Sequence, residues 1–139
     1  MANKHYAQIL TKEQAIAEAK RYLANAKETI AKSPVSSTGK LYSDAKYVRE
    51  GAGSAYLAAL KAIDGWLIEK GVPYDKLPKS IEEYWLAKKK IPQNGKFTDN
   101  LTLAYQNLHI AAYYHAQIDI NIIKDGLIAV KEIIKMLEK

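Results

Sequence analysis

The chain has 139 residues, of which 48% are hydrophobic and 26% charged, and this length fits one domain with a substantial core. It contains no cysteine, which excludes a disulfide scaffold, a thiolate metal site and a cysteine nucleophile. The formal charge of +6 at pH 7 comes almost entirely from lysine, because Arg21 and Arg49 are the only arginines, so specific nucleic-acid binding is the less favoured interpretation.

We expect a single domain over residues 1–139, in which residues 1–10 form a loose lead-in. The segment from Met1 to Leu10 has no long apolar run, so it does not resemble a signal peptide. No stretch of the chain reaches the ~20 apolar residues that are needed to span a bilayer. We therefore expect a cytoplasmic protein without a membrane partner.

The first helix is predicted over residues 12–32. Thr11 and Gln14 have the spacing of a capping box, in which each side chain bonds a backbone amide near the other. Pro34 ends the helix, because proline disfavours a helical residue before it, and a polar loop over 33–40 follows. Apolar residues recur at alternating spacings of three and four, which is typical of one buried helix face: Ile16, Ala19, Leu23, Ala26 and Ile30.

The second helix is predicted over residues 41–70 and carries two apolar faces, which favours a central position with neighbours on both sides. Gly51 and Gly53 weaken a helix, so we expect either a kink there or the close approach of another helix backbone. Gly71 and then Pro73 end this helix. The two faces are Ala45, Val48, Ala52, Ala55 and Ala59 on one side and Tyr56, Leu60, Ile63 and Leu67 on the other.

The next predicted element is a short helix over residues 81–90, after a connector over 72–79. The sequence from Ser80 to Glu83 is a second capping box, and three lysines close the helix with favourable charge. We expect a turn at Pro92 and Asn94-Gly95.

Two further helices are predicted over residues 99–116 and 120–138, separated by a break at 116–119. Thr98 or Asp99 is expected to cap the first of them, and Asp119 the second. Apolar residues do not alternate anywhere, so strands are not expected. The fold class is therefore all-α, an up-down four-helix bundle with one additional short helix.

No recognisable catalytic or metal-binding set is present, and we expect no cofactor. His109 and His115 are six positions apart and point to different helix faces, and neither follows a glutamate in the Glu-x-x-His spacing of dinuclear bundle sites. Asp119 lies four positions after His115, but two ligands do not make a metal site. Neither a Walker motif nor a dinucleotide-binding glycine pattern occurs.

Tyrosine is the unusual component, with 10 residues against a single phenylalanine. Tyrosine buries apolar area but keeps a hydroxyl for water or a partner. One interpretation is that these side chains mark the boundary of the bundle, with hydroxyls at the surface; the other is a tyrosine-lined groove for a ligand or a protein partner. The candidate binding residues are Arg49 and Tyr56 on the second helix and a stripe at spacings of four on the fourth, Tyr105, His109 and Tyr113.

The segment from Ala55 to Ile63, with Trp66 to Gly71 after it, resembles the second-helix signature of HEPN-type helical bundles. Those domains are associated with nucleotidyltransferases in toxin–antitoxin or defence systems, and some are ribonucleases. The resemblance covers about the middle half of the chain and implies the bundle fold and a binding role. The ribonucleases carry an arginine shortly before a histidine, and neither Arg21 nor Arg49 is placed so. An uncharacterised bacterial bundle family is the other assignment.

Three hypotheses follow from the sequence. The favoured one is a non-catalytic bundle that binds a protein partner or a second copy of itself. The alternative is a HEPN-like accessory protein that handles nucleotides or RNA, with Arg49 on phosphate and His109 as acid or base. The third is surface binding of nucleic acid through Lys88-Lys89-Lys90 and Lys96, which salt would weaken steeply.

Overall fold

A computed structural model describes residues 11–92 and 94–139, so the expected lead-in over 1–10 lies outside the described residues. The described chain is all-α, and the connection between its first two helices spans residues 32–44. The elements are α1 (Lys12–Ala31), α2 (Ala45–Glu69), η2 (Tyr74–Lys76), α3 (Ile81–Ala87), η3 (Lys88–Lys90), α4 (Asn94–Leu103), the π-helix η4 (Ala104–Tyr114) and α5 (Ile120–Glu138).

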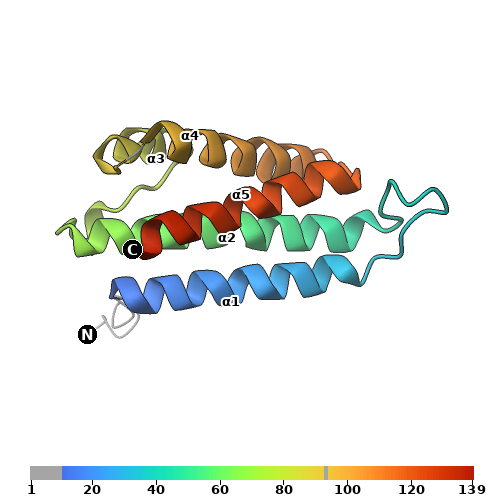
Figure 1. Cartoon of the computed structure of the whole chain (residues 1–139), viewed down its shortest axis with the longest axis horizontal. Helices are drawn as coiled ribbons and strands as arrows, with labels where there is room; N and C mark the ends of the chain where they lie inside the picture. The colour runs from blue at the N-terminus through green and yellow to red at the C-terminus, as the bar shows by residue number, and fades with distance from the viewer. Residues whose placement is uncertain (1–10, 93) are drawn as a thin grey trace.

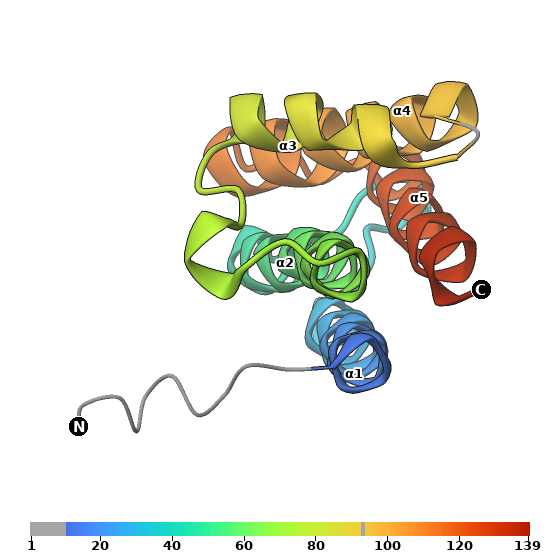
Figure 2. The same cartoon turned by 90° about the vertical axis from the view of Figure 1, so that its left-hand side faces the viewer.

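The long helices alternate in direction, so that α1, α2, the α4–η4 rod and α5 form an up-down bundle (Figure 1). Viewed along the bundle, α2 lies between α1 and the α4–η4 rod, and α5 closes one side while α3 lies toward the other (Figure 2). The prediction of an all-α bundle with one short extra helix is confirmed, and so is the central position of α2. None of the described helices is both long and apolar enough to cross a membrane.

Gly51 lies at a close approach of α1 and α2. A Cβ atom at this position would lie 2.8 Å from the carbonyl oxygen of Ala26, a backbone atom that cannot turn aside. Gly53 instead faces the ring of Tyr113, 3.2 Å from the position of its missing Cβ. The expected close backbone approach therefore occurs at Gly51, while Gly53 meets a side chain. The start of α1 also agrees with prediction, because Thr11 and Gln14 form the full capping box.

The second helix begins at Ala45, so the prediction of a start at residue 41 was wrong. Leu41 and Tyr42 are extended instead, and the Tyr42 amide donates to the carbonyl oxygen of Ile118 at 2.9 Å. Asp44 then caps the helix by accepting from the amide of Lys46. The end of the helix agrees with prediction, since Gly71 adopts a φ of +95°.

Two boundaries in the middle of the chain were also predicted wrongly. The short helix is α-helical only to Ala87 and tightens into η3. The following helix begins at Asn94, so the Asn94-Gly95 pair belongs to its first turn and neither Thr98 nor Asp99 caps it. The second capping box is half formed: Ser80 Oγ accepts from Glu83, but the Glu83 side chain accepts from the amide of Lys79.

The break before α5 is confirmed at residues 116–119. Ala116 adopts the left-handed φ of 55°, which ends η4. The side-chain oxygen of Gln117 then accepts from the amides of Ile118 and Asp119, and Asp119 caps α5 by accepting from Ile122 at 3.1 Å. The turn is built by a strained alanine and a side-chain acceptor, which is why it needs neither glycine nor proline.

Candidate functional site

The π-helix η4 carries most of the candidate residues. Its backbone bonds run from each amide to the fifth residue before it, as the bond from His115 to Ile110 shows at 3.1 Å. Such a helix is wider than an α-helix, so side chains four and five positions apart lie above one another. π-helical turns are rare and are often found at functional sites. Here the widened turn stacks aromatic rings along one face.

His109 lies at the centre of this stack. Its ring is parallel to that of Tyr113, with centroids 6.0 Å apart, and meets Tyr114 edge-on at 5.1 Å. On the other side it contacts Tyr105 at 5.5 Å. These separations lie in the range in which aromatic pairs attract one another. The π-helical spacing explains how one histidine reaches residues at both four and five positions along the chain.

Tyr56 of α2 stacks against His109, with ring centroids 4.8 Å apart. It is buried, and burial, together with the neighbouring Tyr105 phenol, raises the pKa of its hydroxyl to about 12. Burial also lowers the pKa of His109, so the neutral imidazole is favoured at this position. The stacking contact holds Tyr56 of α2 and His109 of η4 face to face.

Arg49 of α2 extends the stack at its other end. Its Nε donates to the carbonyl oxygen of Tyr113 at 2.9 Å, and its guanidinium lies 5.8 Å from the centre of the Tyr113 ring. The arginine is exposed, as are Tyr113 at 42% and Tyr114 at 62%. We call Arg49, Tyr105, His109, Tyr113 and Tyr114 the aromatic surface.

All five candidate residues from the sequence therefore come together in the structure, Tyr56 behind the aromatic surface and the other four within it. Tyr114 was missed, because a spacing of five lies off the stripe of an α-helix. Whether these residues bind a ligand stays a prediction.

A second polar contact adjoins the stack and was also missed. The Tyr84 hydroxyl of α3 donates to Asp64 Oδ1 of α2 at 2.9 Å. Burial raises the pKa of Asp64 to about 6, against the opposing effects of the Tyr84 bond and of Lys61. In the sequence, Asp64 stands out as a single acidic residue within an apolar part of α2, but its partner Tyr84 is twenty positions away. Tyr84, Tyr56, Tyr105 and His109 together line a small hollow of about 200 Å³.

The chemical groups of this site are aromatic rings, one imidazole and one guanidinium. Among residues 11–92 and 94–139, no three His, Asp or Glu side chains gather so as to hold a metal ion. Among the described residues, His109 contacts aromatic rings and Asp64 accepts from the Tyr84 hydroxyl, and neither forms a hydrogen bond with a serine or an ion pair with a second titratable side chain. What the site offers is a row of rigid rings with one fixed guanidinium.

Comparisons with known proteins give a family without an assigned activity. A solved structure described as a protein of unknown function from Dyadobacter fermentans superposes with a TM-score of 0.78 at 28% identity, over 93% of this chain and 98% of that one. No curated protein matches the chain. The family model described as domain of unknown function DUF5618 matches residues 14–139, nearly the whole bundle, and the chain therefore belongs to this family.

Proposed function

We propose that this chain is a non-catalytic module that binds a protein partner through the aromatic surface. The observation that carries the proposal is the exposure of Tyr113 and Tyr114 on a support that already holds them in place. Tyrosine and arginine are the residues that most often supply binding energy at protein interfaces.

The fixed geometry favours binding, because association is weakened by the entropy lost when side chains become ordered. Tyr113 stacks on His109, which stacks on buried Tyr56. Arg49 is held by its bond to the Tyr113 carbonyl and keeps further donors for a partner. Binding of a partner would therefore cost little side-chain entropy, because these side chains are already ordered in the folded chain.

Site-specific photo-crosslinking in cells that contain the gene naturally tests this proposal. A benzophenone amino acid at position 114 is expected to yield one discrete adduct, whose mass identifies either another protein or a second copy of this chain. The matched control carries the same group at Lys89, which is exposed on η3. Adding Arg49→Ala to the position-114 probe should reduce the adduct at least tenfold. Absence of an adduct at 114, or the same adduct at 89, would contradict the proposal.

A HEPN-like nucleotide or RNA accessory is the second candidate, and the hollow beside His109 is the observation that favours it. Lys79 lines this hollow with Tyr56 and Tyr105, so a base could stack on a ring while the ammonium meets a phosphate. Filter binding of labelled RNA and nucleotides, with Arg49→Ala and His109→Ala as variants, distinguishes the two. Unchanged binding in both variants would remove this candidate.

A cytoplasmic location stays a prediction.

A further inference from the structure

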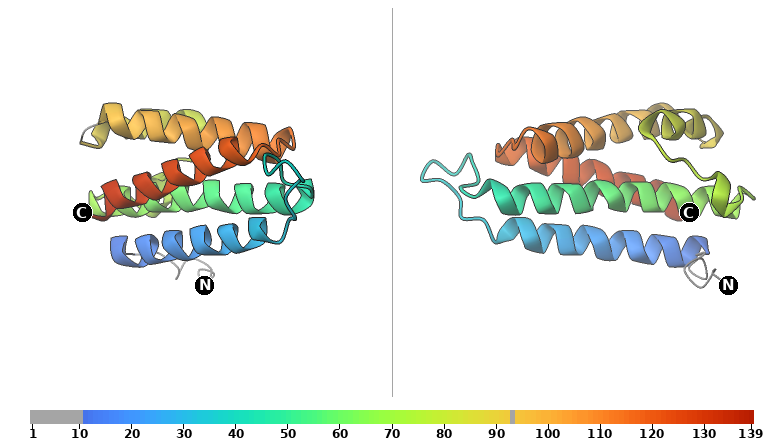
Figure 3. Two further views of the ribbon diagram at one scale, coloured as in Figure 1. Left: turned by 45° about the vertical axis from the view of Figure 1, so that its right-hand side comes forward. Right: turned by 180° about the vertical axis from the view of Figure 1, so that it is seen from behind.

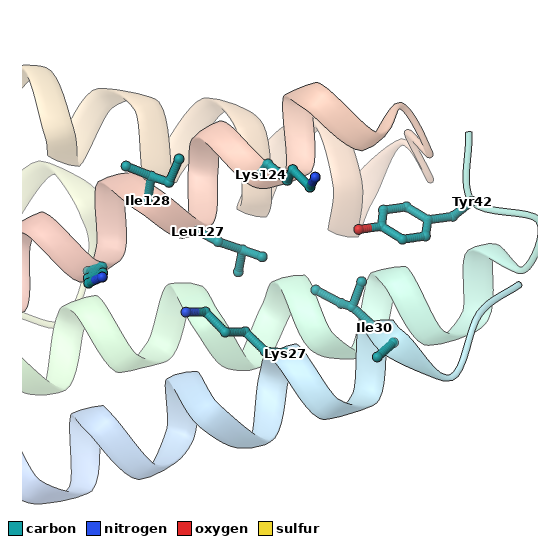
Figure 4. A pocket seen from close by; sticks show the side chains of 8 residues that line it. Lys27, Ile30, Tyr42, Lys124, Leu127 and Ile128 are labelled. Carbon is teal, nitrogen blue, oxygen red and sulfur yellow. The ribbon is translucent and has the colours of Figure 1, made fainter. Parts of the chain in front are cut away.

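A groove on another side of the bundle is formed by α1, α5 and the loop before α2. It has a volume of about 380 Å³. Ile30 and Leu127 lie in the gap between the two helices, and Tyr42 closes one end (Figure 4). Ile128 stays 57% exposed at its edge. None of the residues that line this groove belongs to the aromatic surface, and in Figure 2 α1 and α5 lie below and to the right of α2.

The charged residues around the groove all have the same sign. Lys27 comes from α1, and Lys124 and Lys131 come from α5, two helical turns apart, which is about 10 Å. No carboxylate lines the groove, and none of the three lysines has an ion pair or hydrogen bond with a described residue. Lys61, by contrast, lies near Glu18 of α1 and forms an ion pair with it at 3.5 Å. Three unpaired ammonium groups around an apolar floor call for an anionic ligand.

Tyr42 adds a directed donor. Its hydroxyl points into the groove and makes no hydrogen bond with a described residue (Figure 4). Its backbone is fixed, because its amide donates to Ile118 and the neighbouring Ser43 amide donates to Pro34 at 2.7 Å. Burial raises the pKa of this phenol, so it remains a donor at neutral pH.

We propose that this groove binds a fatty acid of medium chain length, with the alkyl chain against Ile30, Leu127 and Ile128 and the carboxylate between Tyr42 and the lysines. The groove volume of about 380 Å³ favours a chain of about eight to twelve carbons over an extended protein segment. A second copy of this chain is disfavoured, because equivalent lysines would face one another. The surrounding charges favour an acid over a neutral lipid.

Titration of the full chain with sodium decanoate, followed by amide chemical shifts, tests the proposal. Saturable shifts are expected at residues 27–31 and 124–131 and at Tyr42. Octanoate should bind more weakly by about fourfold for each buried methylene that it lacks. Decyltrimethylammonium, which has the same tail and the opposite charge, should not bind. Its binding as tightly as decanoate would overturn the proposal.

Three variants sharpen the test without disturbing the core. Lys124→Glu should weaken decanoate at least tenfold, while Lys89→Glu, the same charge change on η3, should leave it unchanged. Tyr42→Phe removes only the hydroxyl and should weaken decanoate about tenfold. Equal affinities of the two lysine variants, or shifts that map to the aromatic surface, would overturn the proposal. So would shifts in this groove with a glutamate-rich amphipathic peptide but not with decanoate, because they would assign it to a protein partner.

Discussion

The two sides of α2 pack against their neighbours in different ways. Toward α1 the contact is apolar and close, and Gly51 lets the two backbones approach. Toward η4 and α3 the same helix presents Tyr56 and Asp64, whose polar atoms remain at or near the hollow. Figure 3 shows that the first side is a simple pair of helices, whereas the second includes the connector and α3.

This difference separates close apolar packing from polar side chains near the surface within one helix. A glycine-mediated contact leaves no room for a ligand and tolerates little change in volume. Polar aromatic rings are harder to bury than apolar side chains, since each hydroxyl or imidazole nitrogen needs a hydrogen-bond partner or access to water. We infer that the α1 side contributes most to the stability of the bundle, and the η4 side carries the aromatic surface for which we propose a partner.

The largest expected effect is on the α1 side. Gly51→Ala should lower the free energy of unfolding by about 2 kcal/mol, because its Cβ would overlap the Ala26 backbone. Gly53→Ala is the matched control on the other side: the Tyr113 ring, 3.2 Å from the new Cβ, needs to move by only a few tenths of an ångström within its stack, and alanine gains helix propensity. This control should stay within about 1 kcal/mol of wild type. Urea unfolding measures both, and equal stability of the two variants would contradict the contrast.

On the polar side, Tyr84→Phe should lower the free energy of unfolding by about 1–2 kcal/mol at pH 7. The substitution keeps the packed ring and removes the donor that reaches Asp64 Oδ1 at 2.9 Å. Combination with Asp64→Asn should recover part of the loss, because the remaining group carries no charge. Thermal unfolding of the single and double variants provides the measurement. Additive effects would show that the two side chains do not act together.

The first side of α2 could be predicted from the sequence far better than the second. Periodic apolar residues on α1 and α2 and the glycine at 51 are local signals, and they hold regardless of the rest of the fold. The α-helical periodicity of the sequence does not predict the π-helical widening of η4, which brings Tyr114 against His109. The bond between Asp64 and Tyr84 depends on how the connector folds back. The stripe at spacings of four still predicted that Tyr105, His109 and Tyr113 lie together, because it nearly coincides with the π-helical face.

Asp64→Asn should stabilise the chain at pH 7 by about 1 kcal/mol and have little effect near pH 4. Burial raises the pKa of Asp64 from 3.8 to about 6, so the folded chain holds a proton there that the unfolded chain has lost. The stability from this group is complete below pH 3.8 and disappears as the pH rises through about 6. Unfolding free energies from pH 4 to 7 test it. A parallel offset of the variant at every pH would contradict this account.

The smallest effect concerns His109, and its sign is opposite. Burial lowers the pKa of this imidazole below 6.5, so the unfolded chain takes up a proton before the folded chain does and stability falls as the pH falls. His109→Phe keeps a ring in the stack and should remove this loss of stability, whereas Tyr105→Phe should retain it.

Asp64 and His109 therefore have opposite effects on the pH dependence of stability between about pH 4 and 6. With Asp64→Asn alone, the free energy of unfolding should rise more steeply with pH than in wild type. With His109→Phe alone, it should fall more steeply with pH. The slope for the double variant should lie between those of the two single variants. The same sign of change in both single variants would show that these groups do not set the pH response of this side of α2.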